Sequence, residues 1–377
     1  MSIKSDYFKM NRDDFNNYLT SIKNSSNTIK LLNGKYFFYN TIEINNKIIK
    51  LHKDIQNFDN IINSFSNFSK RQITQSFLID EIKSTNSIEN IYSTKHDIFY
   101  IINNINNKDN KIKSISLSYK HLLETKGINI TTLKDIRNLY DNVLKDCIDK
   151  SDIPDGVYFR KKEVYITDGI DLIHSGLIGE DNINKAMNEF ISLYKSNLDI
   201  ITKMILSHFM FEYIHPFYDG NGRLGRYLFS NGLYKELNTI YSFVISYSLE
   251  NEKNKYYKAF KEARDKYSFG CLNEYFETIL DILLNELEII IKELNEKKDI
   301  INNNYIKYDI SKTENKIYKL LIEGTILSNF GICYKEIMDE CNISKRALIY
   351  CMNDLKNKLN LSITKIGRLT YYKIQLK

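Results

Sequence analysis

The chain has 377 residues, of which 43% are hydrophobic and 27% are charged, and this ordinary globular composition argues against wholesale disorder. Its five cysteines are odd in number and include no Cys-x-x-Cys pair, which argues against a disulfide framework or a structural zinc site. No segment has the length and apolarity of a membrane span, and the first residues lack the apolar run of a signal peptide. We therefore expect a cytoplasmic protein that does not contact a membrane.

The N-terminal region, residues 1–110, opens with two β-prone runs at 36–39 and 48–49, which predict short strands or buried edges. Over residues 70–82, apolar side chains recur every three or four positions, the spacing of one helical face. This predicted helix runs towards the polar stretch 84–90, where it can end or bend.

Residues 111–297 are predicted to form a mainly helical core. Two β-prone runs, 157–159 and 164–166, flank four polar residues and predict a β-hairpin. Helices are predicted in this core and just before it over residues 98–105, 133–144, 184–194, 198–213, 222–233, 253–266 and 272–295, and the first two of these are amphipathic.

Between two of these helices lies the sequence IHPFYDGNGRLGR, residues 214–226. The Gly-Asn-Gly turn at 220–222 tolerates positive φ, so it can aim successive backbone N–H groups into a concave nest at the start of the next helix. Arg223 and Arg226 follow three residues apart and face nearly the same way on that helix. A nest, a helix N-terminus and two arginines together predict a site for a di- or triphosphate.

Two further side chains of this segment fit phosphoryl-type chemistry. Asp219 precedes the nest, and a carboxylate beside bound phosphates is the usual protein ligand for Mg²⁺. His215 carries an imidazole, the side chain whose unperturbed pKa lies near neutrality, so it can take a proton from an incoming hydroxyl. Base, metal ligand and phosphate cradle thus lie within twelve residues, and phosphoryl-type transfer depends on such positioning.

The segment resembles the signature of Fic-domain proteins, HPFx(D/N)GNGRxxR, at every specified position. Fic proteins are mostly adenylyltransferases built on a helical core, and the resemblance in pattern covers roughly the middle half of the chain. It implies that AMP is transferred from ATP, bound with Mg²⁺, to a hydroxyl of a target protein. The implied roles are general base for His215, Mg²⁺ ligand for Asp219, phosphate cradle for Gly220, Asn221 and Gly222, β-phosphate contact for Arg223, γ-phosphate contact for Arg226 and core anchor for Phe217.

The predicted hairpin resembles the flap of the same family, which docks a target segment by strand addition. Lys253–Tyr257 resembles a stretch that lines the family's adenosine pocket. We expect His208, which lies among apolar residues of a helix, to be a packed histidine and not a second base. The docking residues implied by the flap resemblance are Tyr158, Phe159, Val164, Tyr165 and Ile166.

The sequence TNSIEN, residues 85–90, matches (S/T)xxxE(G/N), the inhibitory motif of the same family. It lies N-terminal to the core, as in the class with an in-chain inhibitory helix. Glu89 can form a charge-assisted bond with Arg226 and repel the γ-phosphate, which leaves ATP in a pose unsuited to in-line attack. The resemblance implies that Thr85, Glu89 and Asn90 form this inhibitory segment.

The C-terminal domain, residues 311–377, follows a polar linker at 298–310 and carries 12 Lys and Arg against six Asp and Glu, the whole net charge of +6. Three helical patterns precede a strand pair over 363–374, the order of a winged-helix domain. DNA contact through phosphates is one reading of this charge, and a protein-interaction or oligomerisation module with a solvated basic face is the other. The basic residues in question are Lys345, Arg346, Lys356, Lys358, Lys365 and Arg368.

We thus expect a mainly α fold: a Fic helical core with a β-hairpin flap, plus a C-terminal winged-helix-like domain. The expected function is protein adenylyltransfer to a Ser, Thr or Tyr hydroxyl, autoinhibited by Glu89. Three alternatives stay open: removal of AMP, transfer of phosphate or phosphocholine by the same nest, and a nucleotide-sensing DNA-binding regulator. The target protein and the oligomeric state, a homo-oligomer included, are not specified by the sequence.

Overall fold

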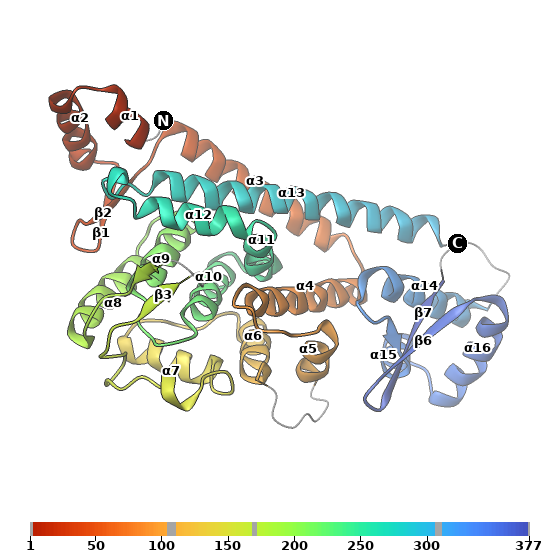
Figure 1. Ribbon diagram of the computed structural model, residues 1–377. Helices are drawn as coiled ribbons and strands as arrows, with labels where there is room; N and C mark the ends of the chain where they lie inside the picture. The colour runs from red at the N-terminus through yellow and green to blue at the C-terminus, as the bar shows by residue number, and fades with distance from the viewer. Residues whose placement is uncertain (1–2, 104–110, 168–171, 306–310, 376–377) are drawn as a thin grey trace.

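The computed structural model describes residues 3–103, 111–167, 172–305 and 311–375. These residues are mostly helical, which confirms the predicted fold class (Figure 1). Buried side chains between Leu31 and Ile374 form one contiguous apolar cluster, so the N-terminal region, the helical core and the C-terminal unit share a core. None of the described helices is both long enough and apolar enough to cross a bilayer.

The N-terminal region contains two long helices. The first of these, α3, includes Ile48 and Ile49, so the strand predicted there is wrong: Ile48 lies on the buried face of this helix with Ile44 and Leu51, whereas Ile49 is exposed. Thr41 caps this helix by accepting a hydrogen bond from the amide of Ile44. The elements of the region are α1 (Ile3–Lys9), α2 (Arg12–Asn24), β1 (Thr28–Leu31), β2 (Tyr36–Tyr39), α3 (Ile42–Asn63), α4 (Asn67–Ile88) and α5 (Lys95–Ile102).

The second long helix, α4, runs through the middle of the molecule, with α5 and α6 on one side and α11 on the other (Figure 1). Because neighbours surround it, α4 buries polar as well as apolar residues, among them Glu81, Thr85 and Asn86. It ends at Ile88 with Glu89 as its C-cap, and Asn90 then takes the left-handed conformation with φ 58°.

The helical core surrounds the segment predicted to carry chemistry. Helix α9 is buried on nearly every face, which is why its apolar residues show no one-sided pattern. The elements of the core are α6 (Lys113–Thr125), α7 (Leu133–Val143), η1 (Lys150–Asp152), β3 (Tyr165–Thr167), β4 (Leu172–Ser175), α8 (Glu180–Tyr194), α9 (Ile200–Ile214), α10 (Asn221–Leu237), η2 (Ile240–Phe243), α11 (Ile245–Asn251), α12 (Lys253–Ala263), η3 (Lys266–Ser268) and α13 (Asn273–Asn303).

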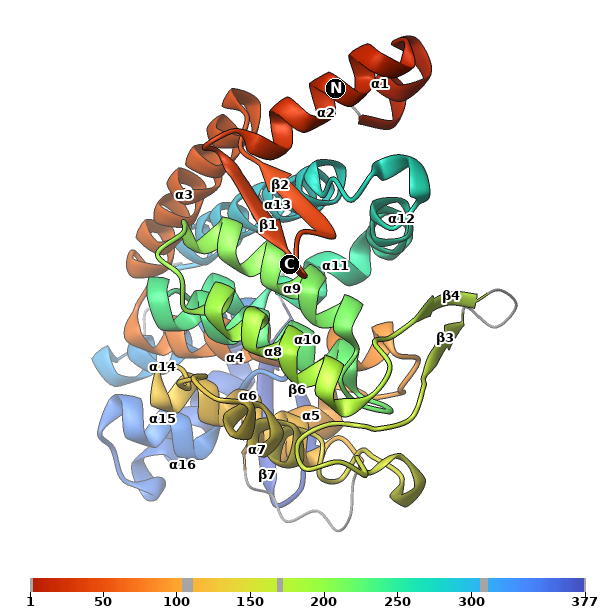
Figure 2. The ribbon, with the colours of Figure 1, turned by 90° about the vertical axis from the view of Figure 1, so that its left-hand side faces the viewer.

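A β-hairpin projects from the core, as Figure 2 shows, but its strands differ from the predicted ones. Strand β3 pairs antiparallel with β4, with Tyr165 opposite Ser175. The predicted strand 157–159 is wrong, because these residues form a bend that precedes the hairpin and Phe159 is buried. The predicted linker 298–310 also begins later, because α13 continues to Asn303; residues 306–310 lie outside the described part.

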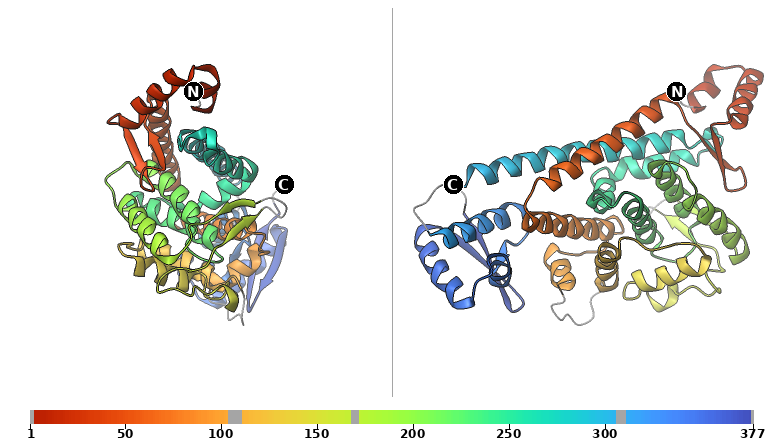
Figure 3. Two further views of the ribbon diagram at one scale, coloured as in Figure 1. Left: turned by 60° about the vertical axis from the view of Figure 1, so that its left-hand side comes forward. Right: turned by 180° about the vertical axis from the view of Figure 1, so that it is seen from behind.

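The C-terminal unit follows the predicted order of three helices and a hairpin. Its elements are α14 (Lys312–Leu327), β5 (Ile332–Cys333), α15 (Tyr334–Cys341), α16 (Lys345–Lys358), β6 (Leu361–Ile366) and β7 (Leu369–Ile374), with sheet order β5-β7-β6. The unit packs against α4 near its N-terminal end and lies away from α9 and α10 in Figure 1 and in the right-hand view of Figure 3.

Candidate active site

The site is built on the turn between α9 and α10. His215 ends α9 in the left-handed conformation (φ 52°, ψ 62°), and Pro216 cannot continue the helix because it has no backbone N–H. Gly220, with φ 80°, leads directly into α10. Asn221 braces the turn, because its side chain accepts from the Phe217 amide and donates to the Phe217 carbonyl, both at 2.9 Å.

Phe217 anchors this turn in the core, as predicted. Its side chain is fully buried and stacks on Tyr140 with ring centroids 3.7 Å apart. The hydroxyl of Tyr140 in turn donates to the backbone carbonyl of Asp219. The turn is therefore held from within before any ligand binds, which limits the cost of ordering it on binding.

The predicted phosphate-binding arginines lie at the start of α10, and both side chains are almost fully buried. Arg223 donates from Nη2 to Asp219 Oδ2 at 3.0 Å, while its Nε and Nη1 have no hydrogen-bond partner among the described residues. Unsatisfied buried donors on a cation are costly, and an anion would satisfy them. Arg223 is thus suited to receive an anionic ligand.

Asp219 has the exposure that a metal ligand needs. Its side chain is half exposed, and its carboxylate accepts from the Gly220 amide at 2.6 Å and from Arg223. Mg²⁺ bound to phosphates typically takes one or two protein carboxylates and keeps several waters. One partly exposed carboxylate beside an anion site fits such an ion.

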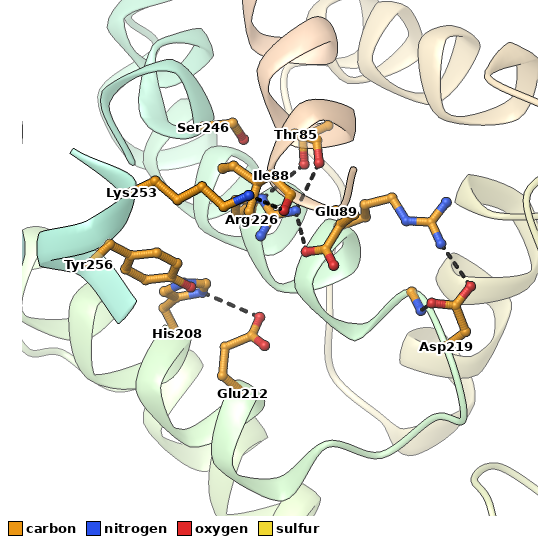
Figure 4. Close-up of polar contacts among 12 residues, drawn as sticks. Thr85, Ile88, Glu89, His208, Glu212, Asp219, Arg226, Ser246, Lys253 and Tyr256 are labelled. Carbon is orange, nitrogen blue, oxygen red and sulfur yellow. Dashed lines mark hydrogen bonds and ion pairs between the residues drawn. The ribbon is translucent and has the colours of Figure 1, made fainter. Parts of the chain in front are cut away.

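Arg226 is occupied by the segment predicted to be inhibitory (Figure 4). Its Nη2 donates to Glu89 Oε1 at 2.8 Å and to the Thr85 carbonyl at 2.9 Å, and its Nε donates to Thr85 Oγ1 at 3.0 Å. A methyl group built on Gly222 would meet Glu89 Oε1 at 2.1 Å. The Glu89 carboxylate therefore lies directly on the Gly-Asn-Gly turn, at the N-terminus of α10.

The electrostatics of Arg226 follow from this pairing. Burial alone would lower the pKa of Arg226, but the charges of Glu89, Tyr256 and Glu212 outweigh it, so the net pKa is raised. The bond to Glu89 is only partly shielded, since the Glu89 side chain is 33% exposed. Arg226 is thus held in its charged form, whereas another anion can reach and displace the partly exposed Glu89 carboxylate.

Sequence reasoning missed a second carboxyl near Arg226. Glu212 lies on α9 and points towards the Arg226 region in Figure 4. Burial raises the pKa of Glu212 to about 8, with the charge of Arg226 opposing the rise and that of Glu89 adding to it. The ring nitrogen Nδ1 of His208 lies 4.0 Å from Glu212 Oε1.

His208 is a packed histidine, as predicted. It is buried, its Nε2 lies 2.9 Å from the Tyr256 hydroxyl, and burial lowers its pKa to about 3. It is therefore neutral at physiological pH. Tyr256 belongs to the Lys253–Tyr257 stretch, and Lys253 Nζ donates to the Ile88 carbonyl at 2.9 Å, so this stretch also holds the end of α4.

Glu81, one α4 turn before Thr85, is the other residue that the sequence did not single out. It is fully buried, and its carboxylate accepts from the Ser246 amide at 2.7 Å and from Ser246 Oγ at 2.6 Å. Ser230 and Tyr119 contribute further contacts at 3.2 Å. Burial raises the pKa of Glu81, and the bonds from Ser246 oppose that rise. An isolated acidic residue gives no sequence signal of such a network.

The predicted flap residues are divided by the structure. Phe159 lies in the core against Phe217, at a centroid distance of 5.5 Å, so its side chain is not exposed for docking. Tyr158 and Val164 are partly exposed. Tyr165 and Ile166 belong to β3, the first strand of the projecting hairpin.

The structure thus places a buried turn at a helix N-terminus, two buried arginines and an adjacent carboxylate together in a helical core. Residues 130–233, which include the turn and both arginines, match the model of the Fic/DOC family. The chain therefore carries a Fic-family domain.

Two relatives extend this comparison. The chain is similar to a solved Fic family protein from Desulfovibrio desulfuricans G20, with 16% sequence identity, a TM-score of 0.53, and coverage of 88% of this chain and 96% of that one. It is also 35% identical over 71 residues to the "Probable protein adenylyltransferase aq_aa38" of Aquifex aeolicus (strain VF5), a match that spans 19% of this chain and 20% of that protein. The first likeness shows a shared fold, and the second is confined to a fifth of the relative's length.

Proposed function

We propose that the protein transfers AMP from ATP to a Ser, Thr or Tyr hydroxyl of a target protein. The observation that carries the proposal is the α9–α10 turn, where two buried arginines, one with unsatisfied donors, lie beside a partly exposed carboxylate. The matched Fic/DOC model and the name of the Aquifex relative support the same activity.

In the proposed reaction His215 removes the proton from the target hydroxyl. The hydroxyl oxygen attacks the α-phosphorus of ATP, the bond from that phosphorus to the bridging oxygen breaks, and pyrophosphate leaves. Arg223 and Arg226 hold the β- and γ-phosphates, and the backbone of the Gly220–Gly222 turn cradles them. Asp219 would hold Mg²⁺, which supplies neutralising charge for the phosphates.

We further propose that the chain inhibits itself through Glu89. Its carboxylate engages Arg226 and lies against Gly222, so a γ-phosphate at Arg226 would meet a negative charge. Asn90 supports this arrangement, since its φ of 58° is a conformation that Asn and Gly tolerate better than other residues.

The test uses ATP labelled at the α-phosphate, Mg²⁺ and cell extract, with wild type, Glu89→Gly, Glu89→Gly/His215→Ala and Asn90→Gly. We expect strong protein labelling by Glu89→Gly, weaker labelling by wild type and none by the double variant. Asn90→Gly, which adds glycine one position later but keeps the carboxylate, should label like wild type. Absence of labelling by Glu89→Gly, while it binds ATP, would contradict AMP transfer.

The alternatives within the family make different predictions in this assay. Transfer of phosphate would label proteins from γ-labelled ATP instead, and the presence of both Gly222 and Arg226 favours AMP transfer over it. Transfer of phosphocholine would give no label from ATP. Removal of AMP would require Glu89, so a pre-labelled protein would lose its label with wild type and keep it with Glu89→Gly.

A second candidate function, DNA binding by the C-terminal unit, is favoured by how its charges are placed. Four acidic side chains of this unit form helix caps, buried hydrogen bonds or contacts with α4: Glu314, Glu323, Glu336 and Glu340. The six basic residues named above, on α16 and the β6–β7 hairpin, are all exposed. The outer surface is therefore more basic than the net charge indicates.

We propose that α16 and the β6–β7 hairpin contact double-stranded DNA. Fluorescence anisotropy with a mixed-sequence duplex should show binding that weakens steeply with salt. Lys345→Glu/Arg346→Glu should reduce affinity at least about tenfold, since each reversed charge loses a phosphate contact and adds repulsion. Lys312→Glu, an exposed reversal on α14, is the control; equal losses from both, or no binding at low salt, would contradict the proposal.

A further inference from the structure

The backbone around His215 is held by the two ends of the projecting hairpin. Three successive carbonyls take part: that of Ile214 accepts from the Leu177 amide at 3.1 Å, and that of Pro216 accepts from the Arg160 amide at 3.2 Å. Between them, the carbonyl of His215 itself accepts from the Arg160 side chain, Nε, at 2.9 Å. The hairpin therefore begins and ends on the segment that carries the proposed base.

Arg160 is the only side chain in this set of contacts, and it is unusual for an arginine. It is fully buried, and burial lowers its pKa. Its Nη1 donates to the Lys162 carbonyl at 2.5 Å, while Nη2 has no hydrogen-bond partner among the described residues. A methyl group built on Gly176 would meet Nη2 at 2.4 Å and His215 Cβ at 2.9 Å. The guanidinium is thus enclosed between the hairpin base and His215.

A buried arginine that leaves a donor unsatisfied is a poor choice for stability alone. Arg160 is instead well suited to hold the backbone of His215. His215 has φ 52°, a conformation that non-glycine residues keep only when their surroundings enforce it. Helix α9 holds His215 from one side, through the bond from its amide to the Phe211 carbonyl. Arg160 holds it from the other side.

We propose that Arg160 is a positioning residue for His215. It fixes the His215 backbone and therefore the direction of the bond from Cα to the imidazole side chain. Through its bond to the Lys162 carbonyl, it also holds this side chain in a fixed position relative to the hairpin. A target strand docked on the hairpin and the base that deprotonates its hydroxyl then share one rigid frame. The inference rests on the proposed AMP transfer for its functional meaning, but its structural part can be tested without that activity.

The experiment uses the full chain in the Glu89→Gly background, with Arg160→Gln and Arg160→Lys. The matched control is Arg137→Gln, since Arg137 also donates to a carbonyl of this segment, that of Tyr158 at 3.4 Å, but is paired with Asp141 and does not reach His215. Two quantities are measured: AMP transfer at varied ATP, and the NMR signal of the His215 imidazole, assigned as the histidine resonance lost in His215→Ala. Thermal unfolding verifies that each variant is folded.

Both Arg160 variants should lower the transfer rate at saturating ATP by on the order of 100-fold, the loss typical of a misplaced reacting group, and leave the KM for ATP within about twofold. The His215 resonance should shift or broaden in both, and Arg137→Gln should change neither quantity. Arg160→Lys keeps the charge and decides the question if Arg160→Gln does not fold. A folded Arg160 variant whose His215 resonance is unmoved overturns the inference. If the Glu89→Gly parent transfers no AMP, the proposed function fails, and the resonance alone still supports or overturns the positioning role.

Discussion

The pair formed by Glu89 and Arg226 makes a prediction about stability as well as activity. Among the described residues, Glu89 is the one charged hydrogen-bond partner of the buried Arg226 guanidinium, and Glu89→Gly removes it, although Thr85 keeps two of the bonds to Arg226. Breaking a fully buried pair costs about 3–5 kcal/mol; because Glu89 is 33% exposed, water can reach the site, and we expect about 1–3 kcal/mol. At roughly 2 °C per kcal/mol, the melting temperature should fall by about 2–6 °C.

ATP should reverse this loss, because its phosphates can take the place of the missing carboxylate. At about 100 times its Kd, a ligand stabilises the folded state by about 2.7 kcal/mol, which corresponds to roughly 5 °C. Wild type should gain less, since ATP competes there with Glu89 for Arg226. Differential scanning fluorimetry with and without Mg²⁺ and ATP measures both effects, with Asn90→Gly as the backbone control. Equal melting temperatures without ATP, or equal gains with it, would refute the reasoning.

Two further predictions concern neighbours of this pair. Because burial raises the pKa of Glu212 to about 8 from an ordinary 4.5, the folded state holds a proton that the unfolded state has lost, and the free energy of unfolding should decrease as pH rises between these values. Glu212→Gln should remove most of that decrease in urea titrations at pH 5 and 8, whereas Glu124→Gln, at an exposed site, should not; an unchanged slope in Glu212→Gln would contradict the assignment. In the Glu89→Gly background, Gly222→Ala should weaken ATP binding at least about tenfold, as measured by calorimetry. The added methyl group would occupy the space beside Gly222 that Glu89 Oε1 fills in the wild type. An unchanged affinity for ATP would show that no phosphate binds beside Gly222.

The backbone of the candidate site can be predicted from the sequence where the information is local. The turn over 214–226 is specified by residues whose backbone preferences are strong: Pro216 after the helix end and Gly220 at positive φ. Asn90 at φ 58° likewise follows directly from a residue type that tolerates this conformation. These features depend on neighbours within a few residues, so one chain suffices to find them.

Other features depend on contacts between distant segments. Glu81 acquires its role from Ser246, 165 residues away, and Arg160 from His215, 55 residues away. Nothing near either residue in the sequence distinguishes it from a surface charge. The predicted hairpin begins one strand too early for the same reason, because the conformation of the β-prone run 157–159 is determined by burial of Phe159 against Phe217 and not by its own propensity.

Helix α4 links the C-terminal unit to the proposed active site. In its first turns, Ser66 and Ser69 donate to Glu323 at 2.8 and 2.7 Å. Towards its C-terminal end, Glu81 accepts a hydrogen bond from the Ser246 amide, and Glu89 of the inhibitory segment then accepts one from Arg226. A helix of 22 residues is about 33 Å long, so these contacts fix both of its ends.

The contacts of α4 determine which movement of the helix releases Arg226 at the lower free-energy cost. A shift of the whole helix would break the buried network of Glu81 and the bonds to Glu323 together, and each unsatisfied buried group costs about 1–3 kcal/mol. Unwinding of the last turn breaks the bonds of Thr85 and Glu89 to Arg226 and the bond from Lys253 to the Ile88 carbonyl, at a place where the Glu89 side chain is already partly exposed. Local unwinding after Glu81 is therefore the route of lower free energy, and hydrogen exchange should be faster at residues 86–90 than at 72–81.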